Sequence, residues 1–186
     1  GRVTFFDNHD MNRFLFLANG DTRRLKLATL CLLTLPFPPV LYYGTEIGLS
    51  QNQDKDAGGL SGDHEVRHDM IWDPALWDHD LLAFFRAIIG LRRQQPVLRR
   101  GKWHPLYTDL ERQIYGYKIV SGSFELQVLF NLSDVSHQIP LDPPQPRQML
   151  LSTNSRNALQ DADAERTLTL EGLSGVVLAS KRSQSM

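Results

Sequence analysis

Two short apolar runs separated by a helical segment constrain the fold of this chain more than any other feature. Residues 1–6 are rich in β-branched and aromatic side chains, and residues 39–43 are wholly apolar. Between them, residues 23–33 repeat apolar side chains at helical spacing after a predicted N-cap at Asp21. Near-continuous apolar strands that alternate with helices are typical of a parallel sheet covered on both faces. The first part of the chain is therefore predicted to be α/β.

A long irregular segment and a second helix complete this first part. Residues 45–77 are rich in Gly, Asp and Asn, and a loop of this length in a compact domain usually has a function. Residues 78–80 are predicted to cap an amphipathic helix that ends before Pro96. Two parallel strands alone bury too little surface to be stable, so this part is expected to need further strands from upstream sequence or from another chain.

The composition changes near Gly101, and only short strand-like runs follow. They predict an antiparallel sandwich or meander, with strands at 113–120, 124–132, 148–151, 167–170 and 175–179. Apolar residues alternate over 124–128, which predicts a strand with one buried face. The chain is thus expected to have two domains, an α/β part at 1–100 and an all-β part at 101–186, with the boundary near residues 98–102.

Polar residues of types common in catalysis follow the first apolar run directly. Asp7, Asn8, His9 and Asp10 bring carboxyl, amide and imidazole groups to the end of the predicted strand. In α/β barrels, catalytic groups lie at this carboxyl end of the strands. The alternative is a turn in which Asp and Asn form local hydrogen bonds.

Composition excludes several classes of protein. The net charge is −1 and no basic stripe is present, so nucleic-acid binding is not expected. The single cysteine, Cys31, rules out an internal disulfide framework. The apolar run at 27–43 is interrupted by prolines and is too short for a membrane span, so it is predicted to be a buried helix followed by a strand. The absence of an initiator Met and of a signal peptide suggests a fragment whose N-terminal portion is missing.

Four segments, in order along the chain, resemble the α-amylase superfamily of glycoside hydrolases. Residues 6–10 look like the motif at the end of the seventh barrel strand, and 35–49 look like the strand-eight segment. Residues 67–73 followed by 91–98 are similar to the neopullulanase and cyclomaltodextrinase branch, and 174–178 resemble the last strand of the C-terminal sandwich. One departure is that the family usually has Gly at the position of Phe37 or Pro38.

The resemblance implies the last two β/α units of a (β/α)8 TIM barrel, from strand seven to helix eight, followed by an antiparallel β-sandwich domain. It makes Asp10 the third catalytic carboxylate and His9 a substrate-contacting residue. Asp63 and Arg67 fall at the spacing that supplies sugar contacts in the neopullulanase-like branch; the alternative is a surface ion pair. Arg13 is a further substrate-site candidate that keeps Asp10 ionised or forms a structural ion pair.

The same resemblance implies a retaining glycoside hydrolase whose substrate is an α-glucan or maltooligosaccharide. The family's nucleophile and general acid lie on earlier strands, so the chain alone is expected to be inactive. Its expected partner is the N-terminal part of the same polypeptide, without which it is expected to form oligomers. No cofactor is indicated; calcium occurs in the family, but residues 54–56 lack the spaced oxygen ligands of a calcium loop.

Two other functions compete with this interpretation. A non-catalytic amylase-like binding or scaffold protein would have lost the upstream carboxylates. A zinc hydrolase would use His64, Glu65 and His68, which match the H-E-x-x-H pattern. That pattern requires a helix, and the glycines before it and Pro74 after it disfavour one.

Overall fold

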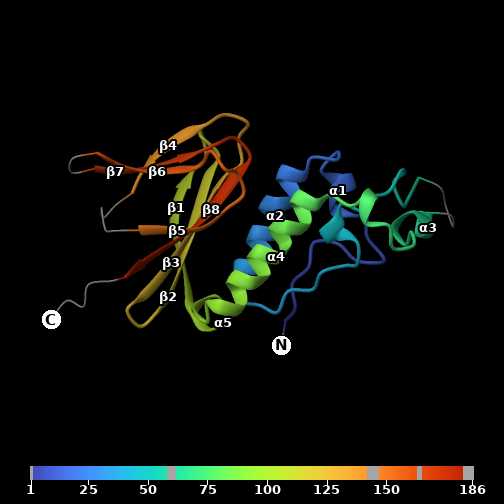
Figure 1. Cartoon of the computed structure of the whole chain (residues 1–186), viewed down its shortest axis with the longest axis horizontal. Helices are drawn as coiled ribbons and strands as arrows, with labels where there is room; N and C mark the ends of the chain where they lie inside the picture. Colours follow the sequence, from blue (N-terminus) through green and yellow to red (C-terminus); the bar gives the residue numbers. More distant parts are fainter. Residues whose placement is uncertain (1, 58–61, 142–146, 163–164, 182–186) are drawn as a thin grey trace. The chain divides into compact units, whose positions relative to one another are not determined.

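The computed structural model describes residues 2–57, 62–141, 147–162 and 165–181 (Figure 1). The chain divides into two compact units. Unit 1 comprises Gly1–Leu33 and Phe37–Ile89, and unit 2 comprises Thr34–Pro36 and Gly90–Met186. One boundary between the units, after Ile89, falls within helix α4 (His79–Gln94).

Short helices and loops make up most of unit 1. Besides α4, its helical elements are α1 (Phe14–Leu17), α2 (Thr22–Thr34), η1 (Thr45–Ile47), α3 (Gly62–Val66) and η3 (Pro74–Leu76). Two predicted N-caps are confirmed. Asp21 Oδ1 accepts a hydrogen bond from the Arg23 amide at 2.9 Å, and Asp78 Oδ1 accepts one from the Leu81 amide at 2.8 Å. No helix in the described part of the chain is long and apolar enough to cross a membrane.

The two predicted strands of unit 1 do not form as regular strands, so that prediction is wrong in extent. They meet in a single parallel bridge between Thr4 and Pro39. The Thr4 amide donates to the Pro38 carbonyl at 3.0 Å, and the Val40 amide donates to the Thr4 carbonyl at 2.8 Å. Prolines have no amide hydrogen to extend this ladder, and two short parallel segments bury too little surface to sustain one.

Unit 2 is a two-sheet β-structure preceded by helix α5 (Val97–Arg100). A five-stranded antiparallel sheet has the order β1-β2-β3-β8-β5, and a three-stranded antiparallel sheet has the order β4-β7-β6 (Figure 1). The strands are β1 (Lys102–Asp109), β2 (Ile114–Ser121), β3 (Phe124–Asn131), β4 (His137–Pro140), β5 (Arg147–Ser152), β6 (Ala158–Ala162), β7 (Glu165–Leu170) and β8 (Ser174–Lys181). The five predicted strands are confirmed as β2, β3, β5, β7 and β8, whereas β1, β4 and β6 were not predicted.

The core of unit 2 lies between the two sheets. Its buried residues are Ile114, Leu129, Ile139, Leu141, Leu168, Leu170, Val176 and Leu178. Strand β3 is buried on both faces from Glu125 to Asn131, so the expectation of one buried face is wrong. The reason is its central position: β2 and β8 flank it, the second sheet covers one face, and α5 also contacts it.

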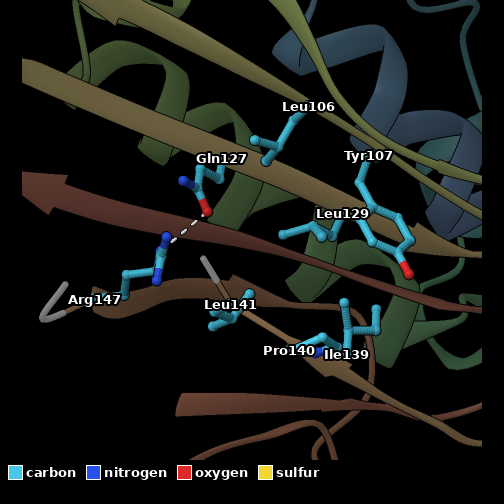
Figure 2. Close-up of a pocket in the computed structure, with 8 residues that line it drawn as sticks. All are labelled: Leu106, Tyr107, Gln127, Leu129, Ile139, Pro140, Leu141 and Arg147. Carbon is cyan, nitrogen blue, oxygen red and sulfur yellow. Dashed lines mark hydrogen bonds between the residues drawn. The ribbon is translucent and has the colours of Figure 1, made fainter. Parts of the chain in front are cut away.

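A pocket opens at one edge of this core (Figure 2). Leucine, isoleucine and proline side chains form most of its wall, together with Tyr107. Its polar side is formed by Gln127 and Arg147, and Arg147 Nε donates to Gln127 Oε1 at 3.1 Å. None of the residues predicted to contact substrate lines this pocket.

Candidate functional site

The polar cluster after the first apolar run forms a turn that exposes two of its side chains. The Asp10 amide donates to Asn8 Oδ1 at 2.8 Å, which is the local hydrogen bond expected of a simple Asx turn. His9 and Asp10 are nevertheless more than half exposed, and His9 Nε2 lies 3.2 Å from Asp10 Oδ2. The turn interpretation and the site interpretation are therefore compatible, because the turn presents these two side chains to solvent.

Arg67 joins this turn to the predicted sugar-contact pair. Its Nη2 lies 3.0 Å from Asp10 Oδ1 and 3.2 Å from Asp63 Oδ2, and its Nε donates to the His9 carbonyl at 3.0 Å. Four of the predicted site residues thus lie in one cluster, although they come from two segments far apart in the sequence. All four side chains are at least 44% exposed, so a ligand that offers hydroxyl groups can reach them.

Arg13 lies apart from this exposed cluster. The ion pairs that the structure gives Asp10 are with His9 and Arg67, not with Arg13. Arg13 is fully buried, its Nη1 donates to the Tyr43 carbonyl at 2.9 Å, and its Cζ lies 4.6 Å and 5.0 Å from the ring centroids of Tyr42 and Tyr43. Among the described residues its Nε and Nη2 have no hydrogen-bond partner. The guanidinium is therefore held against aromatic rings inside unit 1.

Asp7 is a buried acid that the sequence predictions did not include in the site. It is 2% exposed, and its Oδ2 accepts hydrogen bonds from the Phe14 amide at 3.1 Å and the Thr45 hydroxyl at 3.3 Å. Burial raises the pKa of the Asp7 carboxyl, although the Phe14 amide, the nearby charge of Arg13 and the Thr45 hydroxyl oppose the shift. Its position just after the apolar run is the only signal in the sequence that indicates burial.

The long loop is tied to the Asp10 segment by side-chain amides. Asn12 Oδ1 accepts from the Lys55 amide at 2.9 Å and from Gln51 Nε2 at 2.7 Å, and Asn12 Nδ2 donates to Asp54 Oδ2 at 2.8 Å. Gln51 Oε1 accepts from the Arg13 amide at 2.6 Å. This network brings residues 51–55 next to the segment that carries Asp10, and no local sequence pattern predicts such contacts.

The H-E-x-x-H segment does not adopt the geometry of a zinc site. Helix α3 ends at Val66, so His64 and His68 do not share one helix face. Glu65 Oε2 instead accepts hydrogen bonds from the amides of Asn52 and Gln53 at 3.0 Å and 3.3 Å. In the described ranges, no group of three or more His, Cys, Asp or Glu side chains is arranged to hold a metal ion.

Comparison with known proteins assigns the chain to a family. Residues 2–85 match the family model described as "Alpha amylase, catalytic domain", and this segment contains the whole exposed cluster. The chain is a member of the α-amylase family. Its matches include the cyclomaltodextrinase and neopullulanase branch, which confirms the resemblance found in the sequence.

Three relatives illustrate the extent of the similarity. The cyclomaltodextrinase of Geobacillus thermopakistaniensis is 34% identical over 134 residues, covering 72% of this chain and 21% of that protein. Neopullulanase 2 of Thermoactinomyces vulgaris is 25% identical over 179 residues, covering 96% of this chain and 29% of that protein. Among solved structures, the native debranching enzyme of Nostoc punctiforme is 27% identical with a TM-score of 0.77, covering 96% of this chain and 35% of that one. The chain thus spans less than a third of these two curated relatives.

Proposed function

We propose that this chain forms part of the active site of a retaining glycoside hydrolase that acts on α-glucans. The observation that carries the proposal is the position of Arg67, whose guanidinium bridges Asp10 and Asp63 beside His9. The family assignment supports the reaction class, and the relatives include enzymes named for cyclomaltodextrin and pullulan. Maltooligosaccharides and related α-glucans are therefore the proposed substrates.

Each residue of the cluster has a chemical role in this proposal. Retaining glycosidases pass through an oxocarbenium-like transition state flanked by two carboxyl groups. Asp10 is the third carboxylate, which stabilises the developing positive charge and accepts hydrogen bonds from sugar hydroxyls. His9 donates to a hydroxyl of the same sugar ring, while Asp63 and Arg67 bind a neighbouring sugar unit through charge-assisted hydrogen bonds.

The remaining catalytic groups are proposed to lie elsewhere in a longer polypeptide. The support is that the chain spans only 21% of the Geobacillus cyclomaltodextrinase and 29% of Neopullulanase 2. In this proposal, residues 1–100 are the last two β/α units of a (β/α)8 barrel and residues 101–186 are its β-sandwich domain. The nucleophile and the general acid are supplied by the N-terminal part, so the 186-residue chain alone is inactive.

Product stereochemistry tests the proposal. The complete polypeptide is mixed with maltoheptaose, and the first products are followed by ¹H NMR before the anomers interconvert. We expect the α-anomer to appear first, and we expect no turnover by residues 1–186 alone. Products that first appear as the β-anomer would contradict the retaining mechanism. Binding of maltoheptaose without any turnover would support the non-catalytic scaffold instead.

A further inference from the structure

We propose that Tyr42, Tyr43 and Glu65 are positioning residues that anchor segment 65–68 and thereby direct Arg67 toward Asp10. The inference rests on the proposed function, because it explains how the sugar-binding guanidinium is placed. It gives the H-E-x-x-H segment a structural role in place of the zinc-binding role that its geometry does not support.

The first observation is that two tyrosine hydroxyls hold the backbone on either side of Arg67. The Tyr43 hydroxyl donates to the His68 carbonyl at 2.6 Å, and the Tyr42 hydroxyl donates to the Val66 carbonyl at 3.3 Å. Val66 is fully buried, while the Arg67 side chain is 44% exposed. The residues before and after Arg67 are therefore fixed, and its side chain is left free to reach the site.

The second observation is that a buried guanidinium holds the two rings in place. Arg13 lies over both rings, and its Nη1 donates to the Tyr43 carbonyl at 2.9 Å. The rings also contact each other edge-on, with centroids 4.6 Å apart. Burial raises the pKa of Tyr42 to about 12, which further favours the protonated phenol that donates this hydrogen bond. Arg13 therefore takes part in the site indirectly, through these two side chains.

The third observation is that Glu65 fixes the same segment to the long loop. Its carboxylate accepts the amides of Asn52 and Gln53, and the neighbouring Lys55 amide donates to Asn12, two residues beyond Asp10. The segment that carries Arg67 is thus attached by both ends to parts of unit 1 that contact Asn12 and Arg13, shortly after Asp10 in the chain.

These anchors matter because the ion pairs of Arg67 are too exposed to fix its position. Ion pairs between exposed side chains usually contribute little, since water competes and long side chains lose entropy. The side chains of Asp10, Asp63 and Arg67 are 63%, 61% and 44% exposed. The backbone anchors, together with the hydrogen bond from Arg67 Nε to the His9 carbonyl, therefore place the guanidinium more than the ion pairs do.

A double-mutant cycle in the complete polypeptide tests this inference. Tyr43→Phe removes one hydroxyl, and we expect it to lower kcat/KM for a short maltooligosaccharide by about 2- to 10-fold. The change should lie mainly in KM and should shift product length in the same direction as Arg67→Ala. In the Arg67→Ala background, Tyr43→Phe should have no further effect, because the residue that it positions is gone. Tyr115→Phe in β2 is the matched control and should leave both parameters unchanged.

Several results would overturn the inference. One is that Tyr43→Phe lowers kcat/KM equally in the wild-type and Arg67→Ala backgrounds. Another is that Tyr43→Phe leaves KM unchanged although Arg67→Ala raises it. If Asp10→Asn abolishes turnover but Arg67→Ala changes nothing, the positioning role and the sugar-binding role of Arg67 both fail, whereas the hydrolase activity and the role of Asp10 stand.

If the complete protein has no turnover at all, hydrogen exchange still tests the anchors without the proposed function. Tyr43→Phe and Glu65→Gln should then speed amide exchange over residues 63–68, whereas Tyr115→Phe should not. Unchanged exchange in both variants would contradict the anchoring.

Discussion

The interactions that stabilise unit 1 internally differ in kind from those that stabilise unit 2. In unit 2, continuous hydrogen-bonded strand ladders form two sheets, and an apolar core lies between them. In unit 1, side chains far apart in the sequence hold irregular backbone by hydrogen bonds, as Gln51 and Glu65 do. Both units bury apolar side chains, and those of unit 1 include Leu25, Leu30 and Phe85. The difference is that unit 1 also uses polar contacts to place exposed groups, whereas strand ladders around the core between the sheets define unit 2.

One buried polar residue of unit 2 sharpens the contrast. Asn131 is fully buried, and its Nδ2 donates to the carbonyls of Val135, Leu170 and Glu171. Its Oδ1 accepts from the amide and the hydroxyl of Ser133. This side chain fixes a turn inside the sandwich. In unit 1, by comparison, the buried side chain of Gln51 contacts Asn12 and the Arg13 amide, in the segment that follows Asp10.

The largest effect on stability is expected from a truncation in the core of unit 2. Leu168 is fully buried between the sheets, so Leu168→Ala should lower the free energy of unfolding by about 2–5 kcal/mol. Urea denaturation of the complete protein measures this loss, and kcat below the transition should be unchanged. Leu110→Ala, at a side chain that is 85% exposed, is the control. A small loss at Leu168 would contradict the assignment of stability to this core.

A smaller effect, confined to substrate binding, is expected from Arg67→Ala in unit 1. Losing a charge-assisted hydrogen bond to a sugar should reduce kcat/KM by roughly 1–3 kcal/mol and change the distribution of product lengths. The melting temperature should barely move, because the ion pairs of Arg67 are exposed. Arg112→Ala removes the ion pair between a similarly exposed arginine and Asp109 in unit 2, and it should affect neither quantity. Unchanged products in Arg67→Ala would leave only a surface ion pair.

The smallest effect is a pH dependence of stability that comes from Asp7. Burial raises the pKa of this carboxyl above 3.8, so the folded protein keeps a proton that the unfolded chain releases. The carboxyl therefore lowers stability as pH rises from 3.8 through its folded pKa, and its cost is constant above that. Asp7→Asn removes this cost. The variant's free energy of unfolding should therefore exceed the wild type's by an amount that grows as pH rises from 3.8 through the folded pKa of Asp7. A difference that is flat or falls with pH would contradict the burial of an ionisable Asp7.

Local sequence signals predicted the regular elements best. Asp21 and Asp78 marked the starts of α2 and α4, and short strand-like runs between turn residues located five strands of unit 2. Strand β1 was missed because Pro105 and its polar residues give no such run, and most of its side chains are exposed. The predicted strand at 1–6 failed because a strand depends on partners, which the local sequence does not specify.

The candidate site was predicted only where a motif marks it. His9, Asp10, Asp63 and Arg67 were identified by their resemblance to α-amylase family motifs, and the structure brings them together. Tyr42 and Tyr43 were read only as part of an apolar strand, and their hydroxyl contacts were missed. Such contacts join residues more than twenty positions apart, so they depend on the tertiary fold and leave no periodic pattern in the sequence.

Turnover by Asp10→Asn, measured together with its melting temperature, tests the central claim most directly. The substitution keeps the size of an exposed side chain and removes only its charge, so the melting temperature of the complete protein should stay nearly unchanged. Turnover of maltoheptaose should fall by about 10²–10³-fold, because a charge that stabilises the transition state is lost. Asp80→Asn, which removes another exposed and ion-paired carboxylate, should retain full turnover. Near-normal turnover by Asp10→Asn would contradict the account.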